Sequence, residues 1–481
     1  MSLVRNFITV LSGRMFAQVL TVVAMPILAR LYTPEDFGAV SVLTALIQVP
    51  AALYMWRYEQ AIPQAKNDQE ASRLFMLALL LAVLNTILAY FVIQLIPHSY
   101  IARFVPQEIS FFFYLLPLLL LAQSMVSLLR QWAAYSESFK PGVWAEFTGT
   151  LGRRYLPMTL ANVFPVNAWG LLSGLFIAPV LRTMTFVYYF LADRIHFKMY
   201  RYHELLDTAK TYKNFPLYLS WISLLELASL GLPTIILTYY YGLQASGWYG
   251  QAYALLLLPI NLLAQSSGRV FYPRLAKVHH HSPQQSSALV HKVFLVYLDV
   301  TFYPFCALAI IAPDLWTWML GEAFAPSGLM ARALIPYMLI ASIWSPMSVI
   351  VNVLHLQSAL LKYTAMITIG RSIALWIGAY YGSMYTAILA YALSSTVIRA
   401  WQFAWLLQQI DVDLKQLAID SIPRFVFQIP TLIVITYLCS HTGIIGQLLY
   451  CTMGAVVITG FLLRYHPTVK EWMVTQVQSR L

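Results

Sequence analysis

Charged residues are scarce in this sequence, and acidic residues most of all. The 481 residues include only 19 Asp and Glu, and charged residues of all types make up 10% of the chain. An ordinary soluble domain carries about 25%. Hydrophobic residues make up 60%, and the mean hydropathy is +0.67. These values exclude an ordinary soluble protein and indicate an integral membrane protein.

Cysteine is equally scarce, and nucleotide-binding motifs are missing. The three cysteines, Cys306, Cys439 and Cys451, all lie in apolar blocks, where cysteine usually packs as a small hydrophobic residue. We therefore expect no disulfide framework and no metal site. The sequence contains no GxxxxGK[ST] loop and no polar region long enough for a soluble catalytic domain. We expect no cofactor and no enzyme activity.

Apolar blocks recur at the length that a membrane-spanning helix needs, about 20 residues. The predicted spans are 7–29, 37–55, 74–96, 110–133, 143–163, 170–192, 216–240, 247–271, 292–312, 329–352, 364–383, 384–407, 424–440 and 444–464. The sequence thus predicts an all-α polytopic membrane protein with about 14 transmembrane helices, or thirteen if "IGAYYGSMYTAILAY" belongs to one span. The first block contains Arg14 and shows no clear cleavage site, so we interpret it as a retained helix rather than a signal peptide.

Basic residues in the loops predict the orientation. If the N-terminus is cytoplasmic, 20 of the 30 Lys and Arg residues fall on the cytoplasmic side, and only Arg30, Arg103 and Arg332 fall on the other. Because basic loops resist translocation, this asymmetry predicts that both termini lie in the cytoplasm. This asymmetry explains most of the +11 net charge without nucleic acid. Membrane lipids with anionic headgroups are the partners that basic loops favour.

The order of the spans predicts two lobes. We assign 1–192 to an N-terminal lobe, 193–215 to a cytoplasmic linker, 216–408 to a C-terminal lobe and 424–465 to two additional helices. Gly38 and Pro50 have the same twelve-residue separation as Gly247 and Pro259, on the second and eighth spans. The repeat favours two pseudo-symmetric six-helix lobes around a central cavity, as in many transporters.

Seven arginines remain inside predicted spans once the loops are assigned. Arg130 and Arg399 lie near cytoplasmic helix ends, so their side chains can reach the interface. Arg14 and Arg371 lie about 10 Å inside, and Arg153, Arg154 and Arg182 about 15 Å from either end. Each arginine at the centre of a span costs roughly 2.5–3.5 kcal/mol unless it faces a partner or water.

Acidic partners for these arginines are few, namely Glu146, Glu226 and Asp299. Structural ion pairs and a hydrated cationic cavity are the two alternatives, and the shortage of acids favours the cavity. Because the planar guanidinium fork suits phosphate oxygens, we expect the cavity to bind a phosphate-bearing anion. The candidate binding residues are Arg153, Arg154, Arg182, Arg14 and Arg371.

Several segments resemble bacterial oligosaccharide flippases of the Wzx type, in the superfamily that also holds multidrug and toxin extruders. They are "ARLYTPEDFGAVSVL", "RYEQAIPQAKNDQEASRL", "SFKPG", the stretch from "YKNFPLYLSWISLLELASL" to "FYPRLAK", and "QSALLKY". The resemblance implies a two-lobed transporter of twelve to fourteen helices that moves polyprenyl (undecaprenyl) diphosphate-linked oligosaccharide to the outer leaflet. It also makes other polysaccharide assembly proteins candidate partners. The diphosphate headgroup would then be the anion that the arginines bind.

Two other functions fit parts of the sequence. A drug or cation antiporter of the same superfamily is disfavoured, because a cavity with more arginine than acid repels cations. A polysaccharide polymerase or ligase usually needs a substantial outer loop, and the longest outward segments here are "PHSYIARFVPQEIS" and "APDLWTWMLGEAFAPSG". His279, His280 and His281 are adjacent residues in an expected loop, which is a poor preformed metal site.

Because no ATP-binding motif is present, we expect an ion gradient to drive transport. Glu226, near the centre of the seventh predicted span, is the first candidate for the coupling carboxylate, and Asp299 in the ninth is the second. Burial raises a carboxyl pKa and a neighbouring arginine lowers it, which can link ion uptake to conformation. A structural partner for one of the arginines is the alternative role.

Overall fold

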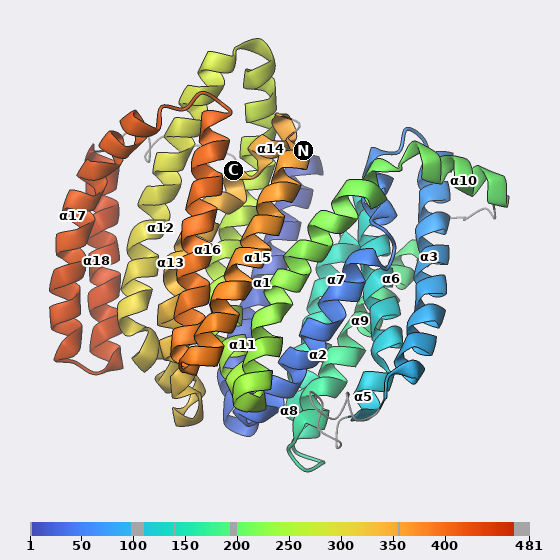
Figure 1. Cartoon of the computed structure of the whole chain (residues 1–481), viewed down its shortest axis with the longest axis horizontal. Coiled ribbons are helices and arrows are strands. Elements are labelled where there is room, and N and C mark those ends of the chain that lie inside the picture. The colour runs from blue at the N-terminus through green and yellow to red at the C-terminus, as the bar shows by residue number, and fades with distance from the viewer. Residues whose placement is uncertain (1, 98–109, 139, 193–199, 355, 466–481) are drawn as a thin grey trace. The chain divides into compact units, whose positions relative to one another are not determined.

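The computed structural model describes residues 2–97, 110–138, 140–192, 200–354 and 356–465 (Figure 1). Within these ranges all regular secondary structure is helical and no strand occurs. Among the described residues, nine helices are long and apolar enough to cross a membrane, and the apolar helical segment Phe16–Leu31 is shorter. The prediction of an all-α, multi-pass membrane protein is confirmed, whereas the count of fourteen spans stays a prediction.

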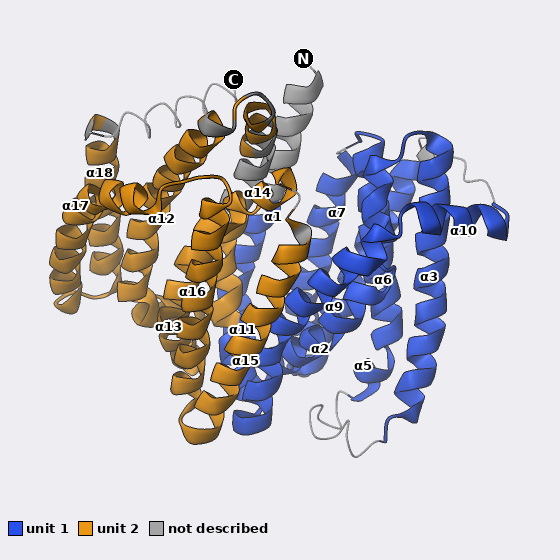
Figure 2. Cartoon of the chain, turned by 45° about the horizontal axis from the view of Figure 1, so that its top comes forward, with its two compact units in different colours: residues 1–250 blue, residues 251–481 orange. Residues whose placement is uncertain are grey.

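The first of two compact units covers residues 1–250 (Figure 2). Its elements are α1 (Ser2–Leu31), α2 (Pro34–Leu53), η1 (Tyr58–Gln64), α3 (Asp68–Leu95), α5 (Ser110–Tyr114), α6 (Leu116–Tyr135), α7 (Lys140–Thr150), η3 (Leu151–Tyr155), α8 (Leu156–Leu160), α9 (Ala168–Ala192), α10 (Tyr202–Thr211), η4 (Phe215–Leu219) and the first part of α11 (Ser220–His281). Local signals place several helix starts. Thr33 forms a capping box with Asp36, and Asn67 accepts a hydrogen bond from the Glu70 amide.

The second unit covers residues 251–481. It holds the rest of α11, then α12 (Pro283–Leu320), η5 (Glu322–Phe324), α13 (Ala325–Met347), α14 (Val349–Val353), α15 (Gln357–Tyr381), α16 (Met384–Gln408), α17 (Leu414–Ser440) and α18 (Ile444–Tyr465). The helices α17 and α18 lie side by side and pack on α12. The Tyr303 hydroxyl of α12 donates to the Cys451 carbonyl of α18 at 2.9 Å and joins these helices within a buried apolar cluster.

Several predicted boundaries differ from the structure. The span 216–240 begins in η4 and continues on α11, and the span 247–271 lies on the same helix, which is interrupted at Gly242, where φ is +82°. The histidine-containing segment between 271 and 292 is not the expected loop, because α11 continues to His281 and α12 begins at Pro283. Proline is tolerated at the first position of a helix, since its missing N–H would have no partner there.

The predicted lobes 1–192 and 216–408, the additional helices 424–465 and the central cavity stay predictions. Part of the expected linker, 193–199, lies outside the described residues. The remainder contains α10, which packs against α3 (Figure 1). There Arg73 Nη2 lies 3.1 Å from Glu204 Oε1. The linker thus contains a helix that is anchored to the first unit.

The two glycines of the repeat meet each other in the first unit. A Cβ atom added to Gly38 would lie 2.0 Å from the Leu243 carbonyl oxygen, and one added to Gly247 would lie 1.8 Å from the Pro34 carbonyl oxygen. The N-terminal part of α2 and this part of α11 therefore approach backbone to backbone. Any side chain larger than glycine would separate them.

We predict that Gly247→Ala lowers the thermal stability of the purified protein. The obstructing atoms belong to backbone that cannot rotate away, and overpacking of this kind costs about 1–3 kcal/mol. Gly460→Ala in α18 is the matched control, because nothing lies within 4 Å of the added carbon. The control should be neutral or more stable in the same detergent melt. Equal melting temperatures for the two variants would contradict the close approach.

Candidate cationic site

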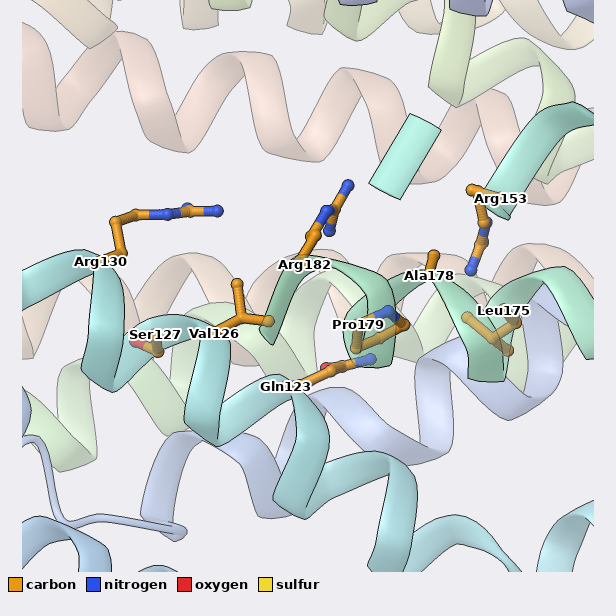
Figure 3. A pocket seen from close by; sticks show the side chains of 9 residues that line it. All are labelled: Gln123, Val126, Ser127, Arg130, Arg153, Leu175, Ala178, Pro179 and Arg182. Carbon is orange, nitrogen blue, oxygen red and sulfur yellow. The ribbon is translucent and has the colours of Figure 1, made fainter. Parts of the chain in front are cut away.

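A pocket of about 360 Å³ lies in the first unit between α6, η3 and α9 (Figure 3). Its lining residues are Gln123, Val126, Ser127, Arg130, Arg153, Leu175, Ala178, Pro179 and Arg182. Figure 3 shows the side chains of Arg130, Arg182 and Arg153 in a row. We call this cavity the arginine pocket. It brings together two of the three arginines predicted at the centre of spans, Arg153 and Arg182.

Glu146 on α7 bridges two of these arginines. Arg130 Nη2 lies 2.7 Å from Glu146 Oε1, and Arg182 Nη2 lies 3.3 Å from Glu146 Oε2. Each carboxylate oxygen therefore holds one guanidinium group, and both cations are fixed at the rim of the pocket. Because Arg153 adds a further positive charge, the described part of the site carries more positive than negative charge.

Arg153 and Arg154 lie on a π-helical turn, η3, in which the Leu156 amide donates to the Leu151 carbonyl five residues earlier. Turns of this kind interrupt α-helices frequently at functional sites. Arg153 lines the arginine pocket, and Arg154 is not among its lining residues. Neither arginine has a carboxylate within 4.0 Å among the ion pairs of the described residues.

Two glycines of α7 and η3 allow α9 to approach the site. A Cβ atom on Gly149 would lie 2.0 Å from Arg182 Nε, and one on Gly152 would lie 2.8 Å from Leu181 Cδ1. The stem of Arg182 thus passes directly over Gly149 to reach Glu146. The Thr148 and Thr185 hydroxyls, 2.8 Å apart, join the same two helices. The close packing at these two glycines therefore also positions the Arg182 guanidinium.

Two arginines of the second unit, Arg371 and Arg399, lie against aromatic rings. Arg371 is 4% exposed, and its Nη1 donates to the Tyr337 hydroxyl at 3.3 Å. Its guanidinium lies 5.5 Å from the centroid of the Tyr391 ring. Arg399 lies 5.0 Å from the centroid of the Trp344 ring. Such cation–π contacts stabilise a desolvated guanidinium by up to about 2 kcal/mol. Arg371 as a substrate ligand stays a prediction.

The predicted coupling carboxylates have different surroundings. Asp299 on α12 is 2% exposed and accepts from Arg424 Nε of α17 at 3.0 Å. Removing one partner of a buried pair costs about 3–5 kcal/mol, so this pair has a structural role whether or not it also takes up ions. Glu226 is an exposed residue of α11. Arg14 lies on α1, and its side chain is outside the described part of the structure.

Two features of the first unit were missed by sequence reasoning. Arg130 was expected to reach the interface, yet it contacts Glu146 and lines the pocket. The signal was a polar stripe on one face of α6, Gln123, Ser127 and Arg130, at helical spacing. A metal site was not expected, and the described residues contain no group of three His, Cys, Asp or Glu side chains that could hold one.

Glu59 is the second feature that was missed. It is 2% exposed in η1, between candidate spans, and its Oε1 lies 3.7 Å from Arg57 Nη1. Burial raises the pKa of the Glu59 carboxyl above its ordinary value, and Arg57 opposes this only in part. The chain enters η1 through Trp56 and Arg57, both with positive φ, a conformation that is uncommon for residues with large side chains.

We predict that Gly149→Ala displaces Arg182 from Glu146 while leaving the helix intact. The added carbon would lie 2.0 Å from Arg182 Nε and 2.7 Å from its Cγ, and alanine favours a helix. Gly149→Ala should therefore lower the melting temperature of the purified protein, and it should cost less in an Arg182→Ala background, where no arginine stem is displaced. Gly142→Ala on the same helix is the control, since its added carbon meets nothing within 4 Å. Equal losses of stability from Gly149→Ala in the two backgrounds would contradict the positioning role.

Comparison with known proteins identifies the family. The chain is 24% identical over 479 residues to the succinoglycan biosynthesis transport protein ExoT of Rhizobium meliloti, covering 95% of this chain and 92% of that protein. Its fold is similar to a lipid II flippase, MurJ, in an inward closed conformation, with a TM-score of 0.70, 15% identity and coverage of 95% of this chain and 99% of that chain.

A multidrug resistance MATE family transporter of the MOP superfamily, in an inward-facing conformation, has a TM-score of 0.59 at 14% identity, over 84% of this chain and 98% of that chain. At such low sequence identities, the two TM-scores show a shared fold. The sequence model of a family described as "Polysaccharide biosynthesis protein" matches residues 27–328, more than half of the chain. The resemblance found in the sequence is thus confirmed, and the chain belongs to this polysaccharide biosynthesis protein family.

Proposed function

We propose that the chain is a flippase that moves polyprenyl diphosphate-linked oligosaccharide repeat units across the bacterial inner membrane, with both termini in the cytoplasm. The observation that carries this proposal is the arginine pocket inside a membrane-embedded unit of a polysaccharide biosynthesis protein. A relative named a succinoglycan biosynthesis transport protein and a fold shared with a lipid II flippase support transport of a lipid-linked sugar.

The chemistry of the pocket suits a diphosphate. Arg130 and Arg182 are oriented by Glu146. Arg153 has no carboxylate within 4.0 Å among the ion pairs of the described residues, which leaves its guanidinium to a ligand. Guanidinium groups donate parallel hydrogen bonds to phosphate oxygens and stay charged at any physiological pH. The diphosphate and sugar would occupy the hydrated space while the polyprenyl tail stays in the bilayer. Arg154, Arg14 and Arg371 are further candidate ligands in an alternating-access cycle.

The two alternative functions are less well supported by these observations. A cation antiporter requires a site that attracts cations, whereas the described arginine pocket carries an excess of positive charge. A polymerase or ligase requires catalytic groups, and the only carboxylate that contacts the pocket arginines, among the described residues, is the doubly paired Glu146. We therefore favour a transporter that does not change its substrate chemically.

We predict that Arg153→Ala and Arg182→Ala each abolish surface polysaccharide at normal protein level. Loss of one charge-assisted contact costs about 1.5–3 kcal/mol, a reduction in substrate affinity of tenfold or more. The measurement is polymer output in cells, together with mass spectrometry of the accumulated lipid-linked intermediate. Arg274→Ala, at an exposed position of α11, is the matched control. Unchanged output in both pocket variants would refute their role as ligands.

We further propose that an ion gradient drives the cycle, with Glu226 as the leading coupling residue and Asp299 as the second. Glu226→Gln is the more informative variant, because Asp299→Asn would leave Arg424 buried without its carboxylate. Glu59 is a third candidate, since its burial raises its pKa and thus favours proton uptake. At low pH the buried Glu59 carboxyl is neutral in the folded protein. The free energy of unfolding then falls as the pH rises through the raised pKa of Glu59.

We predict that an imposed proton or sodium gradient accelerates flipping by the reconstituted wild type and that Glu226→Gln loses this response. The same assay on Glu59→Gln and Asp299→Asn ranks the three carboxylates by how much of the gradient response each variant loses. Each variant is assayed at the same margin below its own melting temperature. A wild-type rate that is insensitive to both gradients would argue against coupling altogether. If the full response persists in Glu226→Gln and is lost in another variant, the coupling role passes to that residue.

A further inference from the structure

A second pocket, of about 440 Å³, lies in the second unit near one end of its helices. Its lining residues are Ala309, Ile310, Asp314, Arg332, Thr436, Cys439, Ser440 and Gln447, from α12, α13, α17 and α18. We call it the α12–α18 pocket. It combines an acidic and a basic side chain that are more than 4.0 Å apart, since no ion pair joins Asp314 to Arg332 among the described residues.

Arg332 donates to two backbone carbonyls in the turn that precedes a proline of the neighbouring helix. Pro313 in α12 has no N–H, so the Ala309 carbonyl lacks its usual helical donor. Arg332 Nε donates to the Ala309 carbonyl and Nη2 to the Ile310 carbonyl, each at 2.9 Å. Both contacts use one side of the guanidinium fork. The remaining N–H donors, including those of Nη1, are directed elsewhere on an exposed side chain.

Gln447 fixes the acidic side of the pocket. It is 6% exposed, and its Nε2 donates to Asp314 Oδ2 at 2.6 Å and lies within 3.3 Å of two backbone carbonyls. Three acceptors around one nitrogen determine the orientation of the amide. Gln447 Oε1 is consequently buried without a partner among the described residues. The exposed Asp314 carboxylate and this oxygen are two acceptors with lone pairs that can still accept a hydrogen bond.

From these contacts we propose that the α12–α18 pocket binds the phosphoethanolamine headgroup of a membrane phospholipid. The phosphate would accept from the free edge of Arg332. The primary ammonium would donate to Asp314 and come within reach of the acceptor on Gln447. A zwitterion places opposite charges a few bonds apart, which matches an acid and a base that line one pocket without pairing.

The position of the pocket favours a lipid over a soluble ligand. Large hydrophobic side chains on the outer faces of α17 and α18 are exposed, among them Ile433, Tyr437, Ile445 and Leu449. Ser440 is the last residue of α17, and Gln447 lies in the first turn of α18. The polar groups therefore lie close to the helix ends, at the depth of lipid headgroups, beside a face that acyl chains can cover.

The test compares three lipids with identical acyl chains on the purified, delipidated full chain by native mass spectrometry. Phosphatidylethanolamine should bind about tenfold more tightly than phosphatidylcholine, because a trimethylammonium group cannot donate to the two acceptors. Phosphatidylglycerol, which has no ammonium, should also bind more weakly. Asp314→Asn should reduce the affinity for phosphatidylethanolamine to that for phosphatidylcholine. Glu322→Gln, an exposed acid in η5 outside the pocket, is the matched control and should keep the preference.

Arg332→Gln tests the contact between the arginine and the lipid phosphate, and it should lower the affinity for all three lipids. Because that change also removes the donors to the α12 carbonyls, the lipid preference of Asp314→Asn is the deciding measurement. Equal affinity of the wild type for the three lipids, or a preference that survives in Asp314→Asn, would overturn the proposal. Displacement of the lipid by equimolar glycerophosphoethanolamine would assign the site to a soluble group and overturn the membrane lipid as its ligand.

Discussion

The first unit depends on the two ion pairs of the Glu146 carboxylate. Its two oxygens hold Arg130 from α6 and Arg182 from α9, so one acid on α7 ties three helices together. In a membrane interior, cations without a partner or water are costly. A single acid shared by two cations holds them in place while leaving net positive charge. That excess is what makes the pocket suited to an anion rather than only to structural pairing.

The second unit stabilises its arginines in other ways. Arg371 and Arg399 lie against the rings of Tyr391 and Trp344, and Arg424 pairs with Asp299. Aromatic faces stabilise a guanidinium without adding a formal negative charge. Each contact also fixes a helix position: Arg332, for example, donates to the Ala309 carbonyl, which Pro313 leaves without its helical donor, and to the adjacent Ile310 carbonyl. The arginines of this unit are therefore part of its packing as well as candidates for binding.

Small residues and irregular turns determine which polar groups meet. Gly149 leaves room for the stem of Arg182, and the π turn at Leu151–Tyr155 places Arg153 in the pocket. Gly38 and Gly247 allow two backbones to touch in the same unit. Since the contacts at Gly38 and Gly247 involve backbone atoms, they leave little freedom for adjustment. The geometry of the site therefore depends on the positions of these glycines as much as on the arginines themselves.

The sequence by itself determined the membrane class, the family and the segments in which deep cations lie, because hydropathy and charge are local properties of the chain. It also singled out Gly38 and Gly247, although not that they touch. Only the tertiary structure decided that Arg153 rather than Arg154 lines the arginine pocket, that Arg130 joins it, and that Asp299 pairs with Arg424. Those outcomes depend on the rotation of each helix and on partners up to 125 residues away in the chain. A π turn or a proline kink shifts that rotation without changing the apolar pattern from which helices are predicted.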